Sequence, residues 1–392
     1  MAGSRTRKKK KPNFFVRMIR PFFGGGGFYD FSLLFLTLLL ACFGLIMIYS
    51  TSYYSAVTQR GDAAYYLKRQ GAMVVAGIVV MLVISKYDYR VLLKRIRKTP
   101  VRWPSILLIG SILLQFYVLV AGEEYNGAKR WINIGPLGTF QPSDFAKFAI
   151  IIYTAYMIHL HPRLLDHFKG FMRIALFVVI DIGLVGIENM STAIIMTLIL
   201  GGMCFIASRN KKYFWILIVA AVVVLVVVLN FGEGFRMARI EAWRNVETDQ
   251  NGYQILQGLY AIASGGIFGR GLGQSTQKLG YIPEAQNDMI FSIICEELGV
   301  FGACCIVLLF IMMLWRIFQI AVNSKELFGG MICVGVLLHI AAQVLLNIAV
   351  VTNTVPSTGV ALPFISYGGT SVAMLLVEVG VVLSVSNRVT SD

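Results

Sequence analysis

The stretch FYDFSLLFLTLLLACFGLIMIYS (28–50) contains a single charged residue, Asp30, and is long enough to cross a membrane as an α-helix. Further apolar stretches follow it along the chain, separated by loops. The 392 residues are 57% hydrophobic and only 14% charged, which excludes a soluble globular domain. The sequence therefore predicts an all-α, polytopic integral membrane protein with about ten transmembrane helices, at 28–50, 69–85, 103–121, 144–160, 172–188, 190–207, 213–231, 288–315, 330–352 and 368–387.

Lysine and arginine are distributed unevenly between the two sides of these spans. With the N-terminus inside, the inner segments hold 24 of the 35 Lys and Arg residues. Short loops rich in these residues stay in the cytoplasm, so both termini are predicted to be cytoplasmic. The net charge of +15 reflects this bias and attraction to anionic lipids, and it does not indicate nucleic acid, because no base-stacking or groove-binding module is present.

One membrane domain accounts for nearly the whole chain. It covers residues 24–388, after a basic cytoplasmic tail (1–23) and before a short cytoplasmic end (389–392). The tail mixes cations with aromatic residues, so it either lies on the anionic inner leaflet or is a disordered segment that only sets topology. No internal repeat is evident, which weakens the case for an inverted-repeat transporter.

Three outer loops are predicted to cover a cavity. The loop between the seventh and eighth spans, about 232–287, is far longer than the others, and such loops are usually functional or disordered. Two more loops, 122–143 and 353–369, are rich in Gly and Pro, which is typical of irregular backbone. Irregular backbone near a membrane must be buried in protein or line a wet cavity.

Several cations fall on the outer side, where few are expected. They could bind an anionic ligand, for which a lipid-linked diphosphate is a good fit. The alternative is neutralisation by the nearby Glu123, Glu124, Glu241, Glu247 and Asp249. The outer cations are Arg60, Lys68, Arg69, Lys129, Arg130, Arg236, Arg239, Arg244, Arg270 and Lys278.

Ionisable residues also lie inside the spans. Asp144 and Lys147 are three residues apart, so they share a helix face and can form an ion pair. The pair either serves the cavity or only locks helices together. For Asp181, Glu378 and His339, interhelical hydrogen bonding is the favoured interpretation.

Asp288 stands at the outer mouth of the eighth span. On a continuous helix, Ser292 and Gly299 would follow beneath it on one face of small residues, which leaves room for another helix or a ligand. Glu296 would lean toward that face, and Glu297 would point away. Just before this span, the run GGIFGRGLGQ (265–274) lacks the strand and the GK[ST] ending of a phosphate loop, so a re-entrant or surface turn is predicted instead.

Four blocks of sequence stand out: GAKRWINIG–QPSDFAK (127–147), GYQILQGLYAIASGGIFGRGLGQSTQKLGYIPEAQND (252–288), EELG (296–299) and TVPSTGVALPFISYGG (354–369). Together they resemble the SEDS family (shape, elongation, division and sporulation), which includes FtsW, RodA and SpoVE. The resemblance covers essentially the whole membrane domain. The QK before YIPEA and the basic tail are more similar to the division and sporulation branch, FtsW and SpoVE.

The resemblance implies a ten-helix fold and peptidoglycan glycosyltransferase activity in the bacterial cytoplasmic membrane. The substrate would be lipid II, a disaccharide–pentapeptide on undecaprenyl diphosphate, polymerised at the outer leaflet. The partner would be a class B penicillin-binding protein, a transpeptidase, alongside other divisome membrane proteins.

The same resemblance assigns roles to residues. Asp288 matches the essential aspartate that ends the PEA-x-x-D block, and it is the predicted catalytic residue. Asp144 and Lys147 match the acidic residue and the lysine of QPSE-x-x-K, although Asp144 is one methylene shorter than the usual Glu. The remaining predicted substrate-binding residues are Lys129, Arg130, Trp131, Lys278, Glu284 and Glu296.

Three further segments depart from the family pattern. ENMST (188–192) stands where many members have PDLGT, so no role is transferred there. Asn287 occupies a position where Thr is common, and Thr352-Asn353-Thr354 replaces the commoner TG-x-L. None of these departures changes Asp288.

A mechanism follows as a hypothesis. Asp288 would take the proton of the attacking C4 hydroxyl as a general base. Nearby cations would stabilise the leaving diphosphate, and a divalent cation (Mg²⁺ or Mn²⁺) on Asp288 could share that task. A lipid II flippase and a scaffold for the transpeptidase are the competing interpretations.

Overall fold

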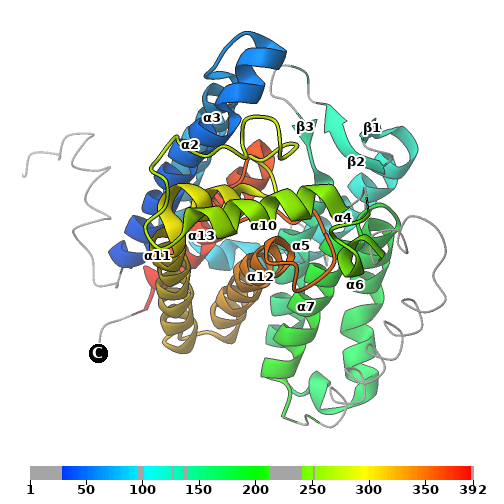
Figure 1. Cartoon of the computed structure of the whole chain (residues 1–392). Helices are drawn as coiled ribbons and strands as arrows, with labels where there is room; N and C mark the ends of the chain where they lie inside the picture. Colours follow the sequence, from blue (N-terminus) through cyan, green and yellow to red (C-terminus); the bar gives the residue numbers. More distant parts are fainter. Residues whose placement is uncertain are drawn as a thin grey trace, which may run out of the picture.

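The computed structural model describes residues 29–95, 101–125, 128–133, 135, 139–209, 211, 241–249 and 252–389. Long α-helices dominate this part of the chain, and most of them run side by side (Figure 1). The helices are α2 (Phe31–Arg60), α3 (Tyr65–Lys86), α4 (Trp103–Ala121), α5 (Pro142–Leu160), α6 (Phe168–Glu188), α7 (Met190–Ala207), α10 (Tyr253–Gly265), α11 (Ile290–Val322), α12 (Leu327–Val351) and α13 (Gly369–Ser386).

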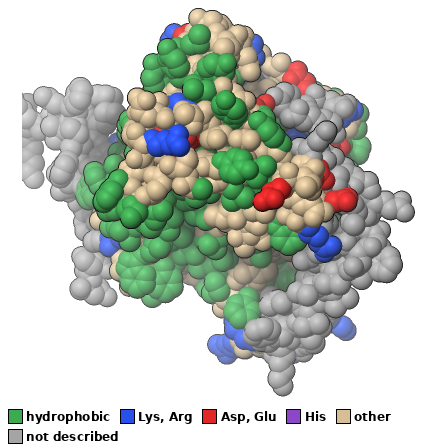
Figure 2. Space-filling view, viewed as in Figure 1, with side chains coloured by type: hydrophobic (Ala, Val, Ile, Leu, Met, Phe, Trp, Pro, Cys, Tyr) green, Lys and Arg blue, Asp and Glu red, His purple; other side chains and the backbone are tan. Residues whose placement is uncertain are grey.

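Eight of the described helices are long and apolar enough to cross a membrane, which confirms the prediction of a polytopic membrane protein. Six of them match a predicted span to within a few residues at both ends, whereas α2 ends ten residues after its predicted span and α11 ends seven residues after its own. The predicted span 213–231 falls outside the described residues, as does the basic tail 1–23. Exposed apolar side chains such as Phe35 and Leu345 fit a surface that faces lipid. Figure 2 shows broad hydrophobic areas with few charged side chains between them.

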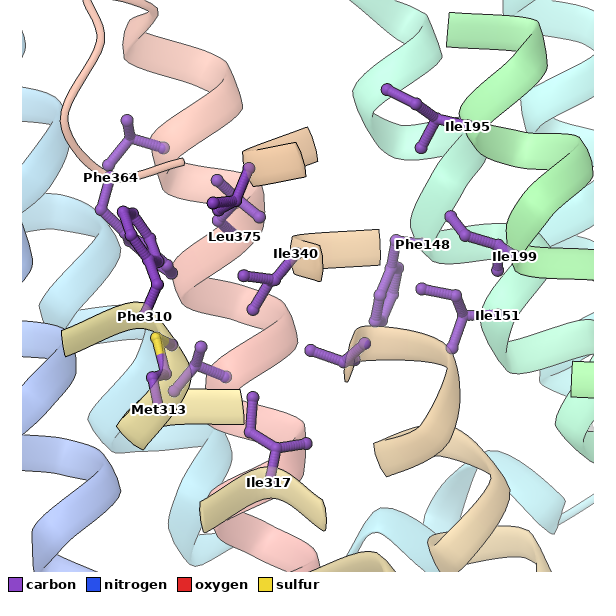
Figure 3. Packing of buried hydrophobic residues seen from close by; sticks show 14 of the residues in the cluster. Phe148, Ile151, Ile195, Ile199, Phe310, Met313, Ile317, Ile340, Phe364 and Leu375 are labelled. Carbon is purple, nitrogen blue, oxygen red and sulfur yellow. The ribbon is translucent and has the colours of Figure 1, made fainter. Parts of the chain in front are cut away.

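Helix α5 differs from these eight because its first two turns carry Asp144 and Lys147. It lies inside the bundle and packs against α4, α7 and α12. In Figure 3, Phe148 and Ile151 of α5 face Ile195 and Ile199 of α7. Most of the helix is buried in protein, so a polar turn is tolerated here that would be costly against lipid.

Polar side chains join neighbouring helices as predicted. Ser111 of α4 donates a hydrogen bond to Asp181 of α6 (2.7 Å). His339 of α12 contacts Glu378 of α13 through Nδ1 (2.8 Å). Both carboxylates are fully buried, and the interhelical interpretation of these three residues is confirmed.

The outer loop 122–143 contains regular structure that its Gly and Pro content did not predict. Strands β1 (Glu123–Tyr125), β2 (Ala128–Asn133) and β3 (Thr139–Phe140) form a small antiparallel sheet. Pairing Ile132 with Phe140 satisfies backbone groups that would otherwise need water. The prediction of an irregular loop is therefore wrong for this segment, whereas 353–368 has only turns and bends.

Helix α11 is broken at Gly299, so the predicted continuous face from Ser292 to Gly299 is wrong. Gly299 has φ 68° and ψ −173°, outside the helical region. The turn after α10 binds the break: the amides of Val300 and Phe301 donate to the carbonyls of Gly266 and Ile267 (both 3.0 Å). The amides of Arg270 and Gly271 donate to the carbonyls of Glu296 and Glu297 (3.0 and 2.9 Å). These four bonds replace helical ones, as irregular backbone at membrane depth requires.

Glycine at 299 is expected to be essential for this junction. A Cβ at Gly299 would lie 2.4 Å from both the amide nitrogen of Gly269 and the carbonyl oxygen of Ile267. Gly299→Ala should therefore lower the free energy of unfolding by at least about 2 kcal/mol, measured as a fall in Tm of the purified protein in detergent.

Gly183→Ala in α6 is the matched control, because nothing lies within 4 Å of the added Cβ. It should leave Tm unchanged or slightly raised. Equal effects of the two substitutions would contradict the proposed junction.

Candidate active site

Asp288 lies two residues before α11 begins, in a turn that joins three parts of the fold. Its side chain is half-buried. Gln254 of α10 reaches Oδ1 from Nε2 at 3.5 Å, a weak contact, and the same amide nitrogen donates to the carbonyl of Pro283 (3.2 Å). On the other side, a Cβ built at Gly359 would be 3.8 Å from Oδ2. The carboxylate therefore sits where α10, the start of α11 and the 353–368 loop meet.

Asn347 fixes the backbone of Asp288, a role that no local sequence pattern indicates. Its Nδ2 donates to the carbonyls of Asp288 and Val360, both at 2.8 Å. Asn347 is 1% exposed and belongs to α12, so one amide couples three segments far apart in sequence. A buried Asn in an apolar helix indicated a polar contact only in general terms.

Glu284 lies in the turn that precedes Asp288. It is exposed, has a positive φ of 47°, and accepts a hydrogen bond from Asn287 Nδ2 (2.7 Å). This local bond stabilises the turn that carries Asp288. Helix α11 then begins with its positive dipole end near the same place, where negative charge is favoured.

Glu296 is fully buried. Its Oε1 accepts from the backbone amide and the hydroxyl of Thr276 (both 3.0 Å) and lies 3.5 Å from Arg270 Nη1. Its Oε2 accepts a short hydrogen bond from the hydroxyl of Ser275. Both carboxylate oxygens are therefore engaged within the protein, and they hold the loop that follows α10.

Lys278 is also buried, and its ammonium has protein partners. It lies 2.7 Å from Glu297 Oε1 and donates to the hydroxyl of Ser50 on α2 (2.9 Å). Ser50 in turn donates to Glu297. Glu297, expected to point away, thus neutralises one of the outer cations, and it was absent from the predicted list of neutralising carboxylates.

Asp144 and Lys147 form the predicted ion pair. Lys147 Nζ lies 2.9 Å from Asp144 Oδ1, and both side chains are almost completely buried, at 4% and 5% exposure. The shorter Asp therefore closes the pair without difficulty. Asp144 Oδ2 is buried with no hydrogen-bond partner in the described part of the chain, so one acceptor within the bundle remains available.

Lys129, Arg130 and Trp131 lie on β2, next to the C-terminal end of α6. The amide of Lys129 donates to Glu188 Oε2 (2.9 Å), and Arg130 Nε donates to the carbonyl of Glu188 (2.8 Å). All three side chains are half-buried. Glu188, in the segment that departs from the family pattern, therefore positions this strand.

The predicted site residues fall into separate groups. Asp288 and Glu284 share one turn, Glu296 and Lys278 are buried behind it, and Asp144 with Lys147 lies on α5. Residues 129–131 occupy the sheet, which reaches the start of α13 through Thr370 and Thr139 (3.5 Å). Helix α12 packs against α5, α11 and α13, and α5 in turn packs against β2, so these two helices connect the groups.

Comparisons with known proteins agree along the length of the chain. A family model described as "Cell cycle protein" (FTSW_RODA_SPOVE) matches residues 31–391. Stage V sporulation protein E of Bacillus subtilis (strain 168) is 36% identical over 363 residues, covering 91% of this chain and 96% of the relative. The probable peptidoglycan glycosyltransferase FtsW of Geobacter sp. (strain M18) is 35% identical over 366 residues, covering 92% and 97%.

Two solved structures share the fold. A chain from a structure described as "Structural coordination of polymerization and crosslinking by a peptidoglycan synthase complex" superposes with a TM-score of 0.77 and 24% identity, covering 93% of this chain and 99% of that one. The rod shape determining protein RodA of Thermus thermophilus gives a TM-score of 0.67 and 23% identity, covering 93% and 98%.

The buried ion pair on α5 generates a prediction about stability. Lys147→Ala would leave Asp144 buried without a counter-ion, so the free energy of unfolding should fall by about 3–5 kcal/mol. The measurement is Tm of the purified protein in detergent.

The double variant Asp144→Asn/Lys147→Met is the control, because it removes both charges and keeps most of the volume. It should recover most of the lost stability. An unchanged Tm for Lys147→Ala would show that the pair contributes nothing to the fold.

Proposed function

Because the chain belongs to the FtsW, RodA and SpoVE family of cell cycle proteins, on its FtsW/SpoVE-like side, we propose that it is a peptidoglycan glycosyltransferase. It polymerises lipid II into glycan strands at the outer face of the bacterial cytoplasmic membrane, in cell division or sporulation. Both termini are cytoplasmic, a placement supported by the excess of Lys and Arg in the segments on that side.

The observation that carries this proposal is the placement of Asp288. A half-buried carboxylate stands at the start of α11, between α10 and the 353–368 loop, with its backbone fixed by Asn347. A sugar hydroxyl is a weak nucleophile, and a positioned carboxylate can accept its proton during attack. Asp288 is therefore assigned as the general base that activates the C4 hydroxyl.

The reaction is a single displacement at C1 of the donor sugar. The C4 oxygen forms a bond to C1, the bond from C1 to the lipid diphosphate breaks, and the diphosphate leaves with the electron pair. One displacement inverts an α-linked donor to a β-linked glycan. A single base suffices, and Asp288 at the mouth of α11 can supply it.

The leaving diphosphate needs positive charge more than it needs a proton. Lys129, Arg130 and Trp131 on β2, and Lys147 with Asp144 on α5, remain the candidates for binding substrate. We revise the roles of Lys278 and Glu296, because both are buried and bonded within the protein. They hold the loop that leads to Asp288, and Glu284 stabilises its last turn.

We propose that a divalent cation, Mg²⁺ or Mn²⁺, binds near Asp288 only when the substrate is also bound. In the described ranges, no group of three or more His, Cys, Asp or Glu side chains could hold a metal ion. Hard cations prefer oxygen ligands, so an ion near Asp288 would need oxygens of the diphosphate to complete its coordination. Bound there, it would neutralise charge on the leaving group.

We propose a class B penicillin-binding protein as partner, with other divisome membrane proteins around the pair. Support comes from the structural neighbour described as part of a peptidoglycan synthase complex that coordinates polymerization and crosslinking. The division of the chain into a basic tail (1–23), a membrane domain (24–388) and a short cytoplasmic end (389–392) belongs to the same proposal. The tail would bind anionic lipids.

A lipid II flippase is the alternative, and one observation favours it. The break at Gly299 gives α11 the discontinuous form that transporters use at their binding sites. Four hydrogen bonds, however, fix the break to the 266–271 turn, and such a rigid junction argues against the helix movement that transport would require.

Removal of the base is the direct test. Asp288→Asn should abolish polymerisation of lipid II by the purified protein with its transpeptidase partner, because Asn cannot accept the hydroxyl proton. The glycan product is measured by gel, with Tm and partner binding as checks on folding. Asp62→Asn is the control, since Asp62 is an exposed carboxylate between α2 and α3 that pairs with Lys68. A fully active Asp288→Asn protein would refute the assignment.

Translocation separates the two candidate functions. The protein is reconstituted in vesicles that contain fluorescent lipid II. If it is a polymerase, lipid II should cross the bilayer no faster than in vesicles without protein. A flippase should translocate it, and Asp288→Asn should retain that transport while forming no glycan. Transport of lipid II by both the unaltered protein and Asp288→Asn would favour the flippase.

A further inference from the structure

A cavity of about 660 Å³ lies at the ends of α5 and α6 on the membrane face opposite Asp288. Asp144 marks the first turn of α5, next to β3, and the helix is about 28 Å long, so its far end at Leu160 reaches the other side of a membrane. The volume is in the range of ligand-binding pockets.

Basic side chains dominate the lining of this cavity. Arg163, Lys169, Arg173, His161 and His167 contribute to it, and none of the described residues that line it is acidic. The three cations are exposed, and none has an ion-pair partner among the described residues. The cavity therefore concentrates positive charge that the described part of the chain leaves unneutralised.

Other arginines on the same face are neutralised by carboxylates. Arg90 pairs with Glu326 (3.0 Å), Arg316 with Asp30 (2.7 Å) and Arg388 with Asp88 (3.2 Å). The described residues thus supply counter-ions elsewhere on this face, whereas no carboxylate among them pairs with the cations that line the cavity. A concave group of unpaired cations is what binding of an external anion requires.

The side of α6 that leads away from the cavity is apolar. Lys169, Arg173 and Leu176 follow one another at helical spacing on one face, and Met172 lies beside them. Met172 and Leu176 are 45% and 57% exposed. A cationic end followed by exposed apolar side chains matches a molecule with an anionic head and a hydrocarbon tail.

We propose that this cavity binds the phosphate group of an anionic phospholipid, whose acyl chains lie along Met172 and Leu176 of α6. A free phosphate would satisfy the cations equally well but would leave the apolar stripe without a role. Basic pockets between transmembrane helices on this side of a membrane bind anionic lipid headgroups in general. The site is separate from Asp288 and does not depend on the proposed reaction.

The test titrates the purified full-length protein in detergent with short-chain phosphatidylglycerol and measures bound lipid by native mass spectrometry. Phosphatidylcholine is titrated in parallel, and inorganic phosphate is added as a competitor. Arg163→Ala/Arg173→Ala should weaken phosphatidylglycerol binding about thirtyfold, and Lys169→Ala alone about fivefold. Tm in phosphatidylcholine should be unchanged for both variants, because these side chains are exposed.

Lys94→Ala/Lys325→Ala is the matched control. This variant loses the same charge, but from exposed positions on the same face that do not line the cavity. It should therefore bind phosphatidylglycerol with the same affinity as the unaltered protein. Equal weakening by both double variants would overturn the proposal in favour of diffuse surface charge. Binding of phosphatidylcholine with equal affinity, or displacement by an equal concentration of inorganic phosphate, would overturn it as well.

Discussion

The position of Asp288 depends on a break in the membrane helix α11. At this break, another segment of the chain supplies the backbone hydrogen bonds that the helix lacks. At Gly299 the amides and carbonyls of α11 lose helical partners, and the turn at 266–271 supplies them. Without water in the bilayer core, each unmade bond would cost several kcal/mol, so the two segments must fold together. Gly265 and Gly269 are needed because a side chain at either position would collide with the backbone of α11.

Two adjacent buried carboxylates connect this junction to the loop that follows α10 and to α2. Glu296 binds Thr276 and Ser275, while Glu297 binds Lys278 and Ser50. Because the two side chains leave the helix in different directions, they hold the loop to α11 and to α2 at once. The chain from Lys278 to Asp288 therefore starts from a rigid point, and Asn347 fixes its end. A base for glycosyl transfer needs this precision, since small displacements of a reacting group are costly.

The sequence predicted the features that depend on local pattern. Apolar length located the spans, and the three-residue spacing of Asp144 and Lys147 predicted their ion pair. It did not predict that Lys278 pairs with Glu297, because those residues are 19 apart and meet only through the broken helix. The sheet at 123–140 was missed since its pairing is short and its Gly and Pro content favoured loop. Asn347 was missed because nothing local indicates which carbonyls a buried amide will bind.

Two lysines predicted to bind substrate show why position in the sequence alone does not determine function. Lys278 and Lys147 are both buried lysines beside a carboxylate, yet the partner of Lys278 closes a loop, whereas Asp144 keeps one oxygen without a partner in the described structure. A pair that is fully bonded within the protein has little left for a ligand, because desolvated charges need every contact they make. An ion pair inside the bundle that still has an oxygen without a partner among the described residues can bind a ligand. By this criterion α5 is a better candidate for contacting substrate than the loop that holds Lys278.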